Sequence, residues 1–127
     1  MVTGLEAARA AAKMALEGMY EGRATVIEHR KATDGASRLT SYVDEAVFTD
    51  VPCRVAFQRL SAAAQGESAA AANQPVKLFL SPDVEVKPNS KIAVSQGGAV
   101  MEYAMSGVPA VYDTHQEVLL ERFRGWA

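Results

Sequence analysis

The sequence predicts a mainly β domain: a small antiparallel β-barrel or sandwich with an N-terminal α-helix and a long loop between early strands. After residue 22, short runs of alternating apolar and polar side chains recur between turn signals made of Gly, Pro, Asn and Asp. Before residue 22, apolar side chains follow helical spacing instead. The 127 residues fit one domain, 1–127, which we divide into a helix over 1–21 and the β-fold over 22–127.

The helix is predicted by TGLEAARAAAKMALEGMYEG, residues 3–22. Thr3 and Glu6 fit a capping box, in which each side chain accepts a backbone N–H of the first turn. We expect Gly22 to end the helix. One apolar stripe recurs at three- and four-residue spacing: Leu5, Ala8, Ala12, Leu16 and Met19.

Two roles for this alanine-rich stripe stay open. It either covers the domain's own sheet or docks on a neighbouring subunit, because alanine buries little area by itself and suits close packing. In the second case we expect Leu5, Ala12 and Leu16 to make the subunit or partner contact, since they lie at the centre of the stripe.

The first strands are expected on both sides of a turn at Asp34-Gly35. RATVIEHRK precedes the turn, and LTSYVDEAVFTDVPCRVAFQRL follows it as extended chain. Pro52 predicts a strand start or an edge there. Cys53, Val55 and Phe57 alternate with polar or small residues, which is typical of a half-buried strand. The run VKLFLS, residues 76–81, is apolar enough for a central strand.

The rest of the chain predicts shorter strands around turns at Pro88-Asn89 and Gly97-Gly98. Among the alternating residues, Ile92 shares a face with Val94, and Tyr103 with the methionines at 101 and 105. The final HQEVLLERFRGWA fits helix or strand by pattern, and the neighbouring strands favour a strand.

Composition excludes several function classes. A net charge of −2 and a pI near 5.7 argue against a basic face that grips nucleic acid. No apolar run approaches the ~20 residues of a membrane span, and the N-terminus does not resemble a signal peptide. A lone cysteine, Cys53, forms no internal disulfide. We therefore expect a soluble protein of a reducing compartment, made in the cytoplasm.

The titratable residues do not predict an enzyme, and we expect no metal and no cofactor. His115 and Glu117 would share a strand face at i, i+2, but metal-site motifs such as CxxC and HExxH are missing. We expect Cys53 to be a small buried side chain. Acidic residues cluster in a stretch that we expect to be a solvated loop: Asp44, Glu45 and Asp50.

An OB-like module that binds single-stranded nucleic acid is an alternative of a different class. Such modules interleave aromatic and basic side chains on exposed strands. Here the basic residues Arg54, Arg59 and Lys77 lie near strand ends without a clear aromatic partner, so the signal is weak.

Several segments together resemble the head-closure proteins of tailed bacteriophages and prophages, also called stoppers or head–tail connector proteins. The similarity spans nearly the whole chain. Its most telling parts are VPCRV at 51–55, PDVEVKPNSKI at 82–92, and the corner Thr114-His115-Gln116-Glu117. None of these carries catalytic chemistry.

The resemblance implies a structural virion protein that forms a homo-oligomeric ring below the portal and adaptor proteins. It would retain packaged double-stranded DNA, which passes through the channel without sequence-specific binding, and would present the surface to which tail terminator or tail proteins attach. Its place would be the neck of the virion, assembled in the cytoplasm of the bacterial host. A tail-completion or tail-terminator protein of the same particle is the alternative within this class.

The resemblance also implies a channel-facing loop, for which residues 61–75, SAAAQGESAAAANQP, are the candidate. A flexible segment of this length spans about 20 Å, enough to reach a neighbouring subunit. Its sole charge is Glu67, so it would neither hold nor strongly repel DNA. We expect its polar residues and glycine to line the channel: Ser61, Gln65, Gly66, Glu67, Ser68, Asn73 and Gln74.

Overall fold

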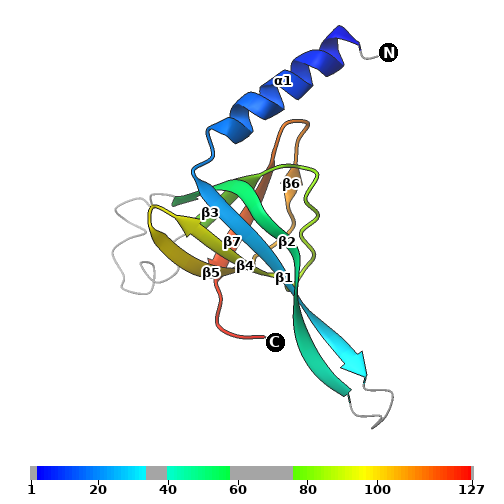
Figure 1. Cartoon of the computed structure of the whole chain (residues 1–127), viewed down its shortest axis with the longest axis vertical. Coiled ribbons are helices and arrows are strands. Elements are labelled where there is room, and N and C mark those ends of the chain that lie inside the picture. Colours follow the sequence, from blue (N-terminus) through cyan, green and yellow to red (C-terminus); the bar gives the residue numbers. More distant parts are fainter. Residues whose placement is uncertain (1–2, 34–39, 58–75, 127) are drawn as a thin grey trace.

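The computed structural model describes residues 3–33, 40–57 and 76–126. It confirms a mainly β chain with antiparallel strands and one N-terminal helix (Figure 1). The elements are α1 (Gly4–Gly18), β1 (Gly22–Thr33), β2 (Thr40–Phe57), β3 (Val76–Leu80), β4 (Lys91–Gln96), β5 (Ala99–Met105), β6 (Ala110–Val111) and β7 (Gln116–Arg122).

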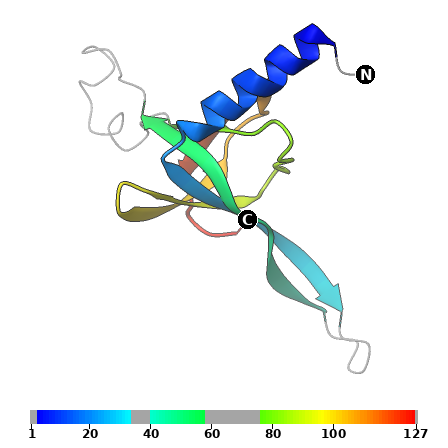
Figure 2. The ribbon, with the colours of Figure 1, turned by 45° about the horizontal axis from the view of Figure 1, so that its top comes forward.

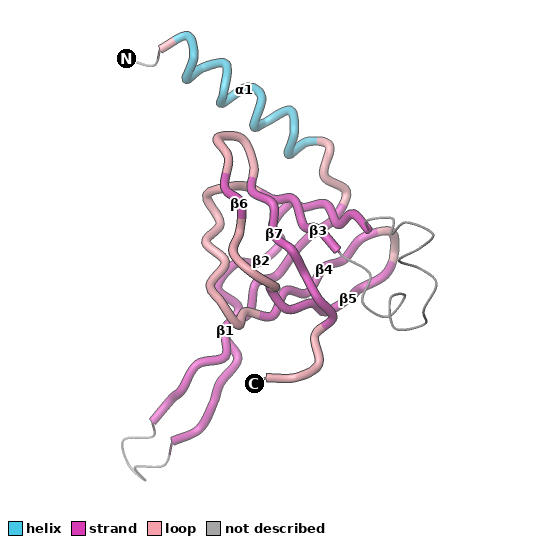
Figure 3. The backbone as a smooth tube through the Cα atoms, turned by 180° about the vertical axis from the view of Figure 1, so that it is seen from behind, coloured by secondary structure: helices cyan, strands magenta, loops and turns pink. Residues whose placement is uncertain are grey.

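The strands form one sheet in the order β3-β2-β1-β4-β5-β7-β6. Because β3 also pairs with β7, the pairings close on themselves and leave only the short β6 outside the circuit. The core is enclosed by this closed sheet (Figure 3). Its buried apolar members come from every strand of the circuit and from the segment before β4: Ala24, Val26, Val51, Cys53, Val55, Val76, Leu78, Leu80, Val84, Val86, Ile92, Val94, Tyr103, Val118 and Leu120.

The capping box predicts the start of α1 correctly. Thr3 Oγ1 accepts the backbone N–H of Glu6 at 3.0 Å, and the Glu6 carboxylate accepts that of Thr3 at 3.1 Å. The predicted end at Gly22 is wrong. The helix ends at Gly18 with Met19 as its cap, and Gly22 is the first residue of β1.

The first two strands are longer than expected. Pro52 does not begin β2, but it does lie at an edge, as predicted: it pairs with Arg23 of β1, whereas the pairing of β2 with β3 begins only at Cys53. The register between β1 and β2 shifts on both sides of Val26, and Asp50 has a φ of 53°. Such bulges admit extra residues into one strand and increase its twist, so an 18-residue strand bends around the core.

Several side-chain predictions hold. Cys53 and Val55 are buried, although Phe57, predicted on the same face, is 57% exposed. The two glycines at 97 and 98 form the turn between β4 and β5 with positive φ values of 62° and 79°, typical of a two-residue hairpin. The C-terminal segment is a strand, as the neighbouring pattern favoured.

A buried amide holds the segment before β4 in place. The Gln116 side chain is 2% exposed, and its Nε2 donates to the backbone carbonyl oxygens of Ser81, at 2.7 Å, and of Val84. A buried amide is costly unless it is hydrogen-bonded, so these two contacts fix the path of the segment over the core.

Candidate interaction surfaces

The helix extends away from the closed sheet (Figures 1 and 2). None of its residues is buried. Of the three predicted contact residues, Leu5 is 61% exposed, Ala12 is exposed and Leu16 is half-buried near the end of the helix. The stripe therefore does not cover the protein's own sheet, and that alternative is wrong. Contact with another subunit remains a prediction.

Two ion pairs connect the helix to the rest of the fold. Arg9 Nε lies 3.1 Å from a carboxylate oxygen of Asp113, and Lys13 pairs with Asp83. The hydrogen bond between Lys13 and Asp83 lowers the pKa of the Asp83 carboxyl and raises that of the Lys13 ammonium. Exposed ion pairs contribute little to stability, and none of the helix residues is buried, so neither ion pairs nor apolar burial holds α1 strongly against the sheet.

The predicted channel loop, residues 61–75 with all seven proposed channel residues, lies outside the described residues. On either side of the loop, Phe57 at the end of β2 pairs with Val76 at the start of β3. Next to Phe57 is an apolar depression of about 140 Å³ that Met101 and Tyr103 help to line.

A second projection, besides α1, lies at the end of the molecule opposite the helix (Figure 1). Beyond Ile27, β1 and β2 continue as a two-stranded hairpin away from the closed sheet (Figure 1). We call residues 28–33 and 40–45 the arm. Its strands remain paired up to Thr33 and Thr40. The expected solvated acidic loop is wrong, because its three carboxylates lie in β2: Asp44 and Glu45 in the arm, Asp50 at the bulge.

Ion pairs tie the two strands of the arm together. His29 Nδ1 lies 2.8 Å from Asp44 Oδ1 across the pair. The Arg30 guanidinium contacts Glu28 at 2.8 Å and Glu45 at 2.7 Å. These contacts raise the pKa of Arg30, the hydrogen bond to Glu28 more than the charge of Glu45. The charges near the base of the arm are thus largely matched within it.

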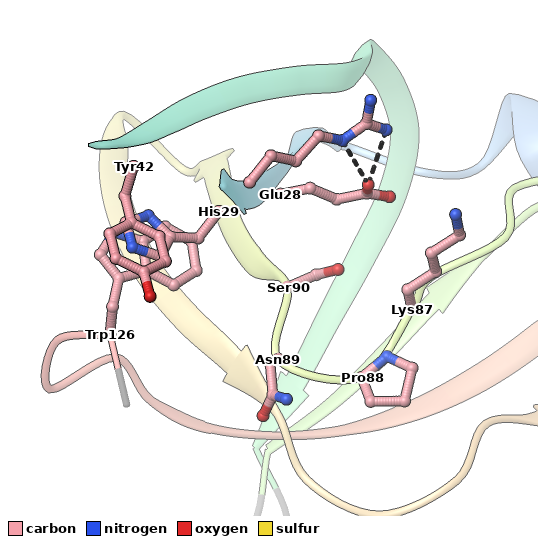
Figure 4. Close-up of a pocket in the computed structure, with 9 residues that line it drawn as sticks. Glu28, His29, Tyr42, Lys87, Pro88, Asn89, Ser90 and Trp126 are labelled. Atoms are coloured by element: carbon pink, nitrogen blue, oxygen red, sulfur yellow. Dashed lines mark hydrogen bonds and ion pairs between the residues drawn. The ribbon is translucent and has the colours of Figure 1, made fainter. Parts of the chain in front are cut away.

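An aromatic stack fixes the base of the arm (Figure 4). The His29 ring lies between Tyr42 and Trp126, with centroid distances of 4.7 and 4.5 Å and interplanar angles of 6° and 12°. Trp126 in turn meets the edge of Phe123 at 5.1 Å. Since Trp126 follows β7, the C-terminal segment clamps a hairpin that begins nearly 100 positions earlier in the chain. The sequence analysis missed this contact, because nothing local marks His29 and Trp126 as neighbours.

A pocket of about 330 Å³ lies between the stack and the turn before β4. The turn supplies Lys87, Pro88, Asn89 and Ser90, and the arm supplies Glu28 with its neighbours on β1 (Figure 4). β4 stops pairing at Lys91, opposite Ile27, so the pocket marks the point where β1 loses its partner strand.

A second histidine, His115, immediately precedes β7. His115 Nε2 is 3.0 Å from Glu117 Oε2, as their i, i+2 spacing predicts, and Lys77 is 3.0 Å from the other oxygen of that carboxylate. These contacts, that of His115 most of all, lower the pKa of Glu117. Tyr112 stacks on the His115 ring at 4.8 Å. Within the described ranges, no group of three or more potential ligands is arranged for a metal ion.

The remaining site candidates from the sequence are the lone cysteine and three basic residues. Cys53 is buried, and this burial raises the pKa of its thiol to about 11, so it is a poor nucleophile. Of the three basic residues considered for nucleic-acid binding, Arg59 is outside the described residues. Arg54 is exposed on β2 opposite Phe79 of β3, and Lys77 lies 6.0 Å from the centre of the Phe79 ring while it pairs with Glu117. The structure therefore gives these two residues an aromatic neighbour that the sequence did not indicate, but Glu117 already balances the charge of Lys77.

Comparison with known proteins gives little. No protein-family model and no curated protein matches the chain. A solved structure that resembles it is the phage-like element PBSX protein xkdH from Bacillus subtilis, at 14% identity and a TM-score of 0.46, with 79% of this chain and 91% of that chain covered. With that TM-score, the likeness carries no argument about what this chain does. Among the described residues, no helix is long and apolar enough to cross a membrane.

Proposed function

We propose that the chain is a structural protein of a tailed phage or prophage particle, and more specifically a head-closure protein of the head–tail connector. Copies would form a ring below the portal and adaptor proteins, retain the packaged DNA and offer the surface to which the tail attaches. The chain would act by assembly and not by turnover of a substrate.

One structural observation supports this proposal beside the sequence resemblance. The helix and the arm project from opposite ends of the closed sheet (Figures 1 and 3), and neither is covered by the chain's own core. Exposed large apolar side chains occur on both projections, among them Met14 at 74% and Tyr42 at 62%. Single exposed apolar side chains are ordinary on a protein surface, so the proposal rests on the two uncovered projections and not on these side chains alone. A connector subunit needs separate surfaces at its two ends.

The charge balance fits DNA that moves past the protein. A net charge of −2 provides little of the phosphate neutralisation that holds DNA. A ring of such subunits would surround DNA without gripping it.

The proposal is tested with particles assembled in the absence of this chain. We expect heads that package DNA and then lose it, which is measured as the DNA content of purified heads and as the fraction that carries a tail. Expression of the chain in trans should restore both. Full, stable and tailed particles without the chain would refute the proposal. Recovery of the chain from purified tails, and not from heads, would favour a tail-completion protein instead.

A further inference from the structure

We propose that the arm is an assembly surface on which copies of this chain pair side by side, the β2 edge of one arm against the β1 edge of the next. This inference rests on the proposed ring of copies and adds the contact that would join them. It concerns only the described part of the arm, residues 28–33 and 40–45.

The backbone of the arm has two free edges. On β1, pairing with β4 ends at Ile27, and on β2, pairing with β3 begins only at Cys53. Between these limits, no strand in the described part of the chain pairs with the outer edge of either arm strand. Each edge presents backbone N–H and C=O groups that can form a ladder with another strand.

A two-stranded hairpin in water is marginally stable by itself, and a third strand stabilises it. This arm exposes large apolar side chains, Tyr42 at 62% and Val43 at 46%. The stack of Tyr42, His29 and Trp126 fixes its base, so the direction of the arm is set before it meets a partner. A preorganised surface loses less conformational entropy on binding.

Two features of the arm favour a second copy as the partner. First, its free edges come from different strands. In a ring whose axis runs along the arms, all arms point the same way, so β2 of one copy runs antiparallel to β1 of the next, and closure of the ring satisfies both edges of every arm. A foreign strand would satisfy one edge alone.

The second feature is charge. The β1 part of the arm carries Glu28, Arg30 and Lys31, so its cationic side chains outnumber its carboxylate, whereas the charged side chains on the β2 part are Asp44 and Glu45. Arg30 is already paired with Glu28 and Glu45 within the arm, which leaves Lys31 as the main cation for a neighbouring β2. Opposite charges on neighbouring strands stabilise a pair, and like charges oppose it. Side-by-side arms therefore place the acidic side chains of one β2 next to the strand that carries Lys31 of the next copy.

The room at the base of the arm is consistent with this arrangement. The turn at Lys87–Ser90 leaves β1 at the pocket described above, so the free edge of β1 starts beside an open space of about 330 Å³ that Trp126 also lines (Figure 4). A neighbouring strand can follow β1 from Thr33 toward this pocket.

The test uses the purified full chain in sedimentation velocity over a concentration series, with hydrogen exchange measured on the same samples. We expect association, and we expect arm amides in residues 28–33 and 40–45 to exchange at least about tenfold more slowly in the associated species. Association in which these amides stay as fast as in the monomer would overturn the inference and leave the ring of copies standing.

The matched variants are Lys31→Glu on the arm and Arg54→Glu on the closed sheet, both of which replace an exposed cation with a carboxylate. We expect Lys31→Glu to weaken association roughly three- to tenfold and Arg54→Glu to leave it nearly unchanged. Equal effects of the two would overturn the inference. A chain that is monomeric at every concentration would also overturn it, and the DNA-retention experiment would then decide the proposed function independently.

Discussion

The start of β1 is the place where a single added methyl group should disturb the fold most. Gly22 lies between Cys53 and the side chain of Gln96. The Gln96 amide accepts the backbone N–H of Val55 at 2.9 Å and donates to the backbone carbonyl oxygen of Val55 at 3.1 Å. The Gln96 side chain thereby pairs with the backbone N–H and C=O of Val55, which lies beyond the first residue of β1 and has no partner on that strand.

Gly22→Ala removes the room that this arrangement needs. A Cβ at this position would lie 3.0 Å from Gln96 Oε1, 3.1 Å from the Cys53 carbonyl oxygen and 3.2 Å from Cys53 Sγ. Two of these atoms belong to a fully buried residue in the middle of a paired strand, so they cannot move away easily. Overpacking of this kind costs about 1–3 kcal/mol. For a chain of this size, that lowers the Tm by about 4–12 °C.

The assay is thermal and urea denaturation followed by circular dichroism. The matched control is Gly18→Ala, because a Cβ there meets nothing within 4 Å. This control should be neutral or stabilising by up to about 1 kcal/mol. In the background of Gln96→Ala, the cost of Gly22→Ala should be smaller, since one of the three close contacts is gone. A Gly22→Ala protein within about 0.3 kcal/mol of the parent would refute the reasoning.

Three further outcomes are expected. Gln116→Ala leaves the backbone carbonyls of Ser81 and Val84 without their buried donor. It should lower the free energy of unfolding by about 2–4 kcal/mol in urea titrations, and an unchanged midpoint would contradict this. The pKa of Glu117 is lowered in the folded protein, chiefly because of its hydrogen bond with His115. The carboxylate therefore stabilises the fold above pH 4.5, its ordinary pKa, and this stabilisation is lost as the pH falls through the lower pKa of the folded protein. Below pH 4.5 the parent should therefore lose stability more steeply than Glu117→Gln, and parallel stability curves would exclude the contact. The thiol of Cys53, with its pKa of about 11, should react with a disulfide reagent only at the rate of unfolding, and rapid labelling of the native protein would show that it is accessible.

Local patterns in the sequence predicted the helix, the strand character of the rest of the chain and the turns at Pro88-Asn89 and Gly97-Gly98, whereas the predicted turn at Asp34-Gly35 lies outside the described residues. The capping box at Thr3 depends on residues three positions apart, and the turn at Gly97-Gly98 on two adjacent glycines that adopt positive φ values. Likewise, the alternation at Val118 and Leu120 identified a buried strand face in β7. These are short-range constraints, which backbone geometry and burial impose within a few residues.

Only the tertiary structure decided where those elements lie. The closure of the sheet depends on β3 pairing with β7, about 40 positions later in the chain. The clamp of Trp126 on His29 and the use of Gln96 to satisfy Val55 likewise join residues that no local pattern relates. The sequence determined by itself that an alanine-rich helix precedes a β-fold, because propensity and periodicity are local. The fold leaves the helix stripe and both edges of the arm uncovered. Long-range pairing decided this, because exposure is a property of the whole assembly of strands and not of any one segment.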